Sequence, residues 1–166
     1  MNEICPDTEF ETDIAELLGE LSSVQDDLLE VLEAKRDLMA KSDVDGMASL
    51  QPREEQLYQR LDACHQRRTM LLESAGDQGL PSDSLGELVS QLPTPHRKQL
   101  SKRVTDASAR MRLLQHQSLT NWVLAQRSIL HLSQLLEIIA TGGQLQPTCG
   151  RSNSFESSGA LVDREA

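Results

Sequence analysis

The chain has 166 residues, a formal net charge of −10 and an aromatic content of only 2%. This length is sufficient for one domain with tails. The scarcity of rings, together with an abundance of Leu, Gln, Glu, Arg and Ser, is typical of long packed helices. The three cysteines, Cys5, Cys64 and Cys149, are widely spaced and form no CxxC motif, so neither a disulfide framework nor a zinc site follows from them.

The charge distribution bears on helix packing, and the N-terminal sequence bears on cellular location. Residues 1–50 hold 14 acidic and 3 basic residues, whereas residues 94–141 hold 2 acidic and 7 basic ones. This asymmetry predicts matching between packed helices, although it could also attract an acidic partner. The opening residues, MNEICPDTEFETD, lack the apolar region of a secretory signal, and no apolar run approaches the length of a membrane span. We therefore expect a cytoplasmic protein without membrane insertion.

The first predicted helix covers about residues 9–41. Thr8 and Glu11 have the spacing of a capping box at its start. Apolar residues then recur at steps of three and four, interrupted only by Lys35. The members of this stripe are Ile14, Leu17, Leu21, Val24, Leu28, Val31 and Leu38.

The stretch KSDVDG ends this helix. Asp43, Asp45 and Gly46 resemble part of a calcium loop, but the other ligands are missing, so we interpret them as a cap or turn. Because Pro52 should not lie inside a helix, we place a short turn of helix at 43–49 and the main second helix at about 52–73. Cys64 falls on the apolar stripe of that helix and is predicted to be core.

Two more helices follow a turn-rich linker, a short one at 84–92 and a long one at about 95–141. Thr94 is the expected N-cap and Pro95 the first helical residue, and Gly142-Gly143 should end the helix. At 1.5 Å per residue this helix is about 70 Å long. The sequence therefore predicts an all-α protein: an elongated antiparallel helical bundle over residues 1–141, with a very long C-terminal helix, and a flexible tail at 142–166 that can order on binding.

The long helix changes character halfway along. Its seam consists of Leu100, Val104, Ala107, Met111, Leu114, Ser118, Asn121, Ala125, Ser128, Leu132, Leu135 and Ile139. Polar residues flank the first half of this seam, so one neighbouring surface suffices there. From Leu119 onward apolar residues occupy most of the circumference, namely Trp122, Val123, Leu124, Ile129, Leu130, Leu136 and Ile138. Burying these side chains is worth over ~10 kcal/mol gross, so they should be covered by a second bundle layer, a homodimer or another protein's helix.

Motifs for catalysis and cofactor binding are missing. The sequence contains no P-loop, GxGxxG, GxSxG or HExxH. The four histidines, at 65, 96, 116 and 131, do not have metal-ligand spacing, so we expect no enzyme activity, no metal and no cofactor. The basic residues Arg97, Lys98, Lys102, Arg103, Arg110 and Arg112 could touch phosphates. Aromatic residues are not interleaved with them, however, and the acidic first helix opposes nucleic-acid binding.

Three features resemble the family of FlgN-type flagellar export chaperones. The first is the all-helical size with a long last helix, and the second is NWVLAQRSILHLSQLLEII, in which Asn121 opens a Leu-rich helix. The third is the tail TCGRSNSFESSGALVDREA, which is similar to the family's closing pattern of Tyr-Gly, a Ser/Gly-rich spacer and Leu-(Ile/Val)-Asp-(Arg/Lys)-x-Ala. Cys149 replaces the family's tyrosine before Gly150.

The resemblance implies a cytoplasmic type III secretion chaperone. Such a protein masks the C-terminal helices of hook-associated (hook–filament junction) proteins and delivers them to the export gate. The cargo-binding residues would be Leu119, Asn121, Trp122, Val123, Ala125, Ile129, Leu130, Leu136, Leu161 and Val162. Docking on the gate would involve Cys149, Gly150 and Phe155, and Trp122 should be half-buried in the free protein.

A second reading of the same pattern stays open. The chain could be a homo-oligomeric coiled-coil structural or adaptor protein whose apolar half-helix is its own interface. The free chain would then be a dimer, whereas the chaperone reading allows a monomer or a homodimer.

Overall fold

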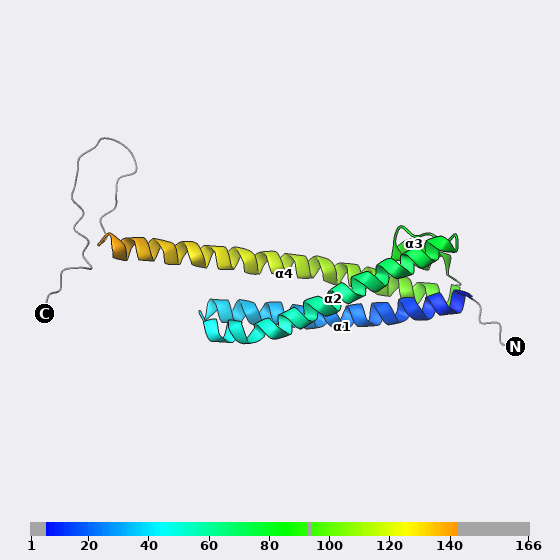
Figure 1. The fold of residues 1–166 in the computed structure, drawn as a ribbon, viewed down its shortest axis with the longest axis horizontal. Coiled ribbons are helices and arrows are strands. Elements are labelled where there is room, and N and C mark those ends of the chain that lie inside the picture. The colour runs from blue at the N-terminus through cyan, green and yellow to red at the C-terminus, as the bar shows by residue number, and fades with distance from the viewer. Residues whose placement is uncertain (1–5, 93, 143–166) are drawn as a thin grey trace, which may run out of the picture. The chain divides into compact units, whose positions relative to one another are not determined.

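The computed structural model describes residues 6–92 and 94–142, and its regular structure there is helical (Figure 1). Helix α1 spans Pro6–Ala40, α2 spans Val44–Asp77, α3 spans Leu85–Gln91 and α4 spans Thr94–Ala140. The all-α class and the very long last helix are thereby confirmed. Apart from Gly142, the predicted tail lies outside the described residues.

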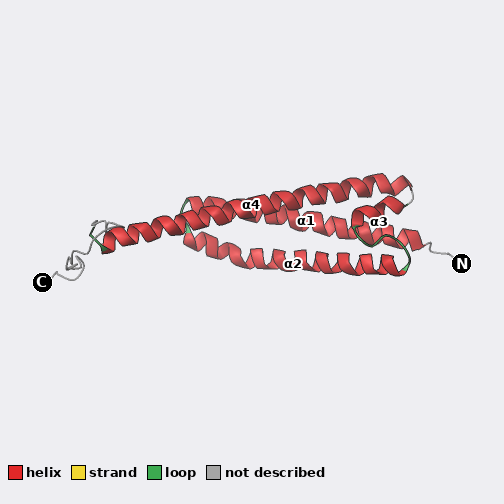
Figure 2. Cartoon of the chain, turned by 90° about the horizontal axis from the view of Figure 1, so that it is seen from above, coloured by secondary structure: helices red, strands yellow, loops and turns green. Residues whose placement is uncertain are grey.

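The chain divides into two compact units, Met1–Asn121 and Trp122–Ala166, so the boundary falls inside α4. In the first unit, α1 and α2 form an antiparallel hairpin (Figures 1 and 2). The first part of α4 runs in the same direction as α1. Two hydrogen bonds fix that direction: Arg103 Nη2 donates to Ala15 O over 2.9 Å, and further along Asn121 Nδ2 donates to Leu32 O over 2.8 Å.

The core of the first unit consists of two apolar clusters. The larger one joins all four helices, and its buried members are Phe10, Ile14, Leu17, Leu18, Cys64, Leu71, Leu72, Ala75, Leu85, Leu88, Val89, Leu92, Leu100 and Ala107. The smaller one contains Val24, Leu28, Val31, Leu32, Leu57 and Leu114. The predicted apolar stripe of α1 thus contributes residues to both clusters. The predicted core position of Cys64 is confirmed.

A ladder of ion pairs links α2 to α1. Three arginines of α2 stand seven residues apart and face the acidic side of α1. The pairs are Arg53 with Asp27 and Glu30, Arg60 with Glu20 and Asp27, and Arg67 with Asp13 and Glu16, at 2.7–3.9 Å. Because these groups are largely exposed, each pair contributes roughly 0–1 kcal/mol. The ladder therefore helps to set the register of the hairpin and contributes little to its stability.

The turn between α1 and α2 shows the predicted cap. Asp43 is the N-cap of α2, and its Oδ1 accepts a hydrogen bond of 2.8 Å from the Gly46 amide. A Cβ atom at Gly46 would lie 2.6 Å from Asp43 Oδ2, so glycine is needed at this close approach. Within the described residues there is no cluster of His, Cys, Asp and Glu that could hold a metal ion.

Two predicted helix starts are wrong. Helix α1 begins at Pro6, so Thr8 lies inside it and is not its N-cap. Helix α2 begins at Val44 and continues through Pro52. Proline removes the hydrogen bond to the carbonyl of Ala48, but both residues are exposed, so water can solvate that carbonyl. The N-cap formed by the Asp43 carboxylate then favours one long helix over two short ones.

The remaining boundaries follow ordinary capping rules. Gly79, with φ of 76°, ends α2, and the Leu80 amide donates to Ala75 O over 2.9 Å. Ser84 caps α3 by accepting a hydrogen bond from the Glu87 amide. Gly142, with φ of 62°, follows the end of α4, as predicted from the Gly142-Gly143 pair.

Candidate functional site

The buried seam of α4 ends at Asn121. Leu100, Ala107, Leu114 and Asn121 stand seven residues apart and are 4–7% exposed. The next position of the same series, Ser128, is exposed. The heptad spacing continues past Asn121 without a break, whereas burial of the seam positions stops there.

Asn121 is part of the bundle rather than a surface contact. Its Nδ2 donates to Leu32 O over 2.8 Å, and its Oδ1 accepts from Arg36 Nε over 3.2 Å. Asn121 is 5% exposed, and both polar atoms of its side chain have hydrogen-bond partners within the first unit. The sequence predicts Asn121 as a cargo contact, and in the structure its side-chain amide is hydrogen-bonded to α1. An asparagine at a seam position characteristically fixes the register of packed helices.

The second unit carries a dense set of exposed apolar side chains on α4. The large ones, each 40–66% exposed, are Trp122, Val123, Ile129, Leu130, Leu132, Leu135, Leu136, Ile138 and Ile139. Leu124 and Ala125 are intermediate. Trp122, predicted to be half-buried, is 60% exposed.

Helical geometry sorts these residues onto two faces. At 3.6 residues per turn, one face covers an arc of about 160° in which Ser128 is the single polar member. We call this the distal face, and its apolar members are Trp122, Leu124, Ala125, Ile129, Leu132, Leu135, Leu136 and Ile139. Val123 and Leu130 form a narrow strip on the opposite side. Polar residues separate this strip from the distal face, with Ile138 as the one apolar residue between them. The charged side chains of this stretch, Arg127 and Glu137, lie outside the distal face.

The predicted site residues therefore fall into three groups. Trp122, Ala125, Ile129 and Leu136 lie on the distal face, and Val123 and Leu130 lie on the opposite strip. Leu119 belongs to the first unit, where it is 61% exposed. Leu161, Val162, Cys149, Gly150 and Phe155 lie outside the described residues.

Sequence reasoning missed part of the distal face. Leu132, Leu135 and Ile139 belong to the seam and are not among the predicted cargo-binding residues, and they are 41–60% exposed. Their spacing is the same as that of the buried seam residues before Asn121, so no signal in the pattern distinguishes them.

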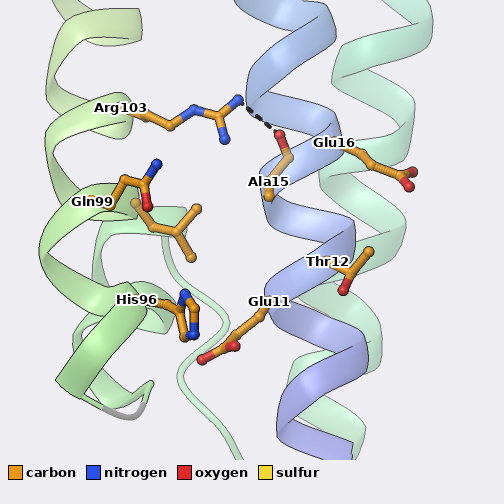
Figure 3. Close-up of a pocket in the computed structure, with 8 residues that line it drawn as sticks. Glu11, Thr12, Ala15, Glu16, His96, Gln99 and Arg103 are labelled. Carbon is orange, nitrogen blue, oxygen red and sulfur yellow. Dashed lines mark hydrogen bonds between the residues drawn. The ribbon is translucent and has the colours of Figure 1, made fainter.

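Three basic residues of α4, Arg97, Arg103 and Arg110, contact the protein itself, whereas Lys98, Lys102 and Arg112 are exposed. Figure 3 shows Arg103 reaching from α4 to the Ala15 carbonyl of α1, beside a polar cleft that Glu11 and His96 also line. Arg110 Nε lies 2.9 Å from Asp26 Oδ1, and Arg97 Nη1 donates to Ser90 O over 3.2 Å. In the described residues, one ion pair, Arg110 with Asp26, joins the acidic first helix to the basic last helix, whereas the arginines that face the other acidic residues of α1 belong to α2.

Cys64 does not have the surroundings of a reactive thiol. Burial raises the pKa of its thiol, and the nearby carboxylate of Glu20 raises it further, while Arg60 and Arg67 oppose this shift. The side chain is 5% exposed. A buried, protonated thiol behaves as a small apolar core residue.

The family model described as "FlgN protein" matches residues 10–148, which covers most of the chain. The chain belongs to the FlgN family. Its members are flagellar export chaperones, a class not known for enzymatic activity, and this chaperone role extends to the present chain. No curated protein and no solved structure matches the chain.

The matched span places the family likeness in the helices. It includes α2, α3, α4 and nearly all of α1, and it ends before Cys149. The closing pattern around Leu161 and Val162 therefore lies beyond the match. In the ranges that the structure describes, no helix of this FlgN-family chain is long and apolar enough to cross a membrane.

Proposed function

We propose that this FlgN-family chaperone binds the C-terminal helical segments of hook-associated proteins on the distal face of α4. The observation that carries the proposal is the exposure of this face over residues 122–139. An amphipathic helix can bind such an apolar surface with anchors at i, i+3, i+4 and i+7. Masking the partner's apolar helices prevents their premature association, and release then delivers them to the export gate.

The chemistry of the distal face suits a partner that must later leave. The face holds no charged residue, so recognition rests on apolar contact and shape. Such contact tolerates related helices, which fits a chaperone with more than one client. The tail residues Leu161 and Val162 are proposed to join the contact when the partner is bound, and Cys149, Gly150 and Phe155 to dock on the gate.

A calorimetric titration tests this proposal. The cell holds the full chain, and the syringe holds the C-terminal region of a hook-associated protein from the same organism. In the test variant, Ile129→Gln and Leu136→Gln make the distal face polar while glutamine keeps a good helix propensity. The matched control, Val123→Gln and Leu130→Gln, makes the same change on the opposite strip.

The expected results differ between the two variants. Two apolar anchors at roughly 1.5–3 kcal/mol each predict a loss of affinity of more than about 100-fold for the test variant. The control should stay within a few-fold of the unmodified chain. Failure of the unmodified chain to bind, together with a stable dimer in sedimentation, would favour the homo-oligomer instead.

A further inference from the structure

The short helix α3 shows what kind of segment the first unit can hold between its long helices. Figure 2 shows α3 between α2 and α4. It buries four apolar residues in the i, i+3, i+4, i+7 pattern, namely Leu85, Leu88, Val89 and Leu92. Leu88 and Val89 are fully buried, so α3 completes the bundle at this end.

The core residues that share a cluster with α3 have counterparts two heptads away on each long helix, later in the sequence on α1 and α4 and earlier on the antiparallel α2. The large core cluster around α3 includes Ile14 and Leu18 of α1, Leu72 and Ala75 of α2, and Leu100 of α4. A shift of two heptads leads to Leu28 and Leu32, to Tyr58 and Leu61, and to Leu114, respectively. All five of these residues line one groove between α1, α2 and α4. The groove is therefore continuous in register with the seat of α3.

This groove is apolar and open. Its volume is about 440 Å³, and its floor is formed by Leu28, Leu32 and Leu114, which are 3–7% exposed. Tyr58 and Leu119 stand on its rim, 50% and 61% exposed. Its polar lining consists of Gln115 and Ser118 together with the hydroxyl of Tyr58. In contrast to the α3 end, these apolar side chains have no helix over them in the described part of the chain.

We propose that this groove receives a short amphipathic helix of the exported protein, with apolar residues in the i, i+3, i+4, i+7 pattern that α3 shows. The inference rests on the proposed function for the source of the helix, and it adds a second contact in the first unit, separate from the distal face. Two observations favour this occupant. The groove continues the interface that already holds an amphipathic helix. It is also small, because nine residues line it, whereas a stable dimer interface uses roughly 20–30 residues on each side.

Filling the groove tests the proposal without disturbing the core. Ser118 is exposed and lines the groove, so Ser118→Phe should occupy the space that the partner's side chains would take. Thr120→Phe is the matched control, because Thr120 is also exposed on α4 but points roughly to the opposite side of the helix. Both full-length variants are titrated with the C-terminal region of the hook-associated protein, after thermal unfolding has verified that they fold.

We expect Ser118→Phe to weaken binding at least about tenfold and Thr120→Phe to leave it within about twofold. Equal affinities for the two variants would overturn the proposal. If Ile129→Gln with Leu136→Gln abolishes binding while Ser118→Phe has no effect, the proposed function stands and the groove contact is wrong. If Ser118→Phe instead converts a dimer into a monomer in sedimentation, the occupant is a second copy and the proposal also fails.

Discussion

Asn121 offers a test of where the bundle ends and the binding surface begins. Replacement by alanine removes two hydrogen bonds, the donation to Leu32 O at 2.8 Å and the acceptance from Arg36 Nε at 3.2 Å. At roughly 0.5–1.5 kcal/mol each, the expected loss of stability is about 1–3 kcal/mol. The matched control is Ser128→Ala, one heptad later on the same seam but exposed, which should change stability by no more than about 0.5 kcal/mol.

The assay is urea unfolding followed by far-UV circular dichroism, with the slope m used to verify that the transition is comparable. Partner affinity is measured in parallel. Asn121→Ala should bind the hook-associated segment within about twofold of the unmodified chain, because the amide faces α1. A loss of stability below about 0.5 kcal/mol, or a large loss of affinity with stability unchanged, would refute this reasoning and return Asn121 to the contact surface.

Three further predictions concern the helices themselves. Pro52→Ala restores a donor to the Ala48 carbonyl inside α2 and should raise the free energy of unfolding by up to ~3 kcal/mol; a decrease would mean that the helix is not continuous there. Gly79→Ala should lower it by about 1 kcal/mol, since φ at this position is +76°, and an unchanged urea midpoint would contradict this assignment. Because burial raises the pKa of its thiol, Cys64 should react with a thiol reagent only upon unfolding when the other two cysteines are serine; fast labelling of the native chain would show the thiol to be accessible.

The sequence predicted the helices well because their signals are local. The stripe from Ile14 to Leu38 and the Gly142-Gly143 stop depend on periodicity and on backbone preferences of single residues. Pro52 shows the limit of such rules. Its penalty is real, but the exposed Ala48 carbonyl can be solvated and the Asp43 cap stabilises a helix start at Val44, so α2 continues through Pro52.

The site was harder to predict because it depends on where a neighbouring helix stops. The seam of α4 keeps its spacing from Leu100 to Ile139, and only the extent of α1 and α2 decides which part is covered. Asn121, predicted as a cargo contact, is 5% exposed, whereas Leu132, a member of the same seam, is 58% exposed. A pattern in one helix reports which face is apolar, not what lies against it.

Trp122 allows the most direct test of the proposed binding surface. It is the only tryptophan of the chain, it lies on the distal face and it is 60% exposed. We would titrate the chain with the C-terminal region of a tryptophan-free hook-associated segment and record the emission maximum and acrylamide quenching. If the distal face binds the partner, the emission shifts to the blue and quenching falls, both saturating with the calorimetric affinity. Unchanged emission and quenching at a concentration where calorimetry shows full binding would place the partner elsewhere and contradict the account.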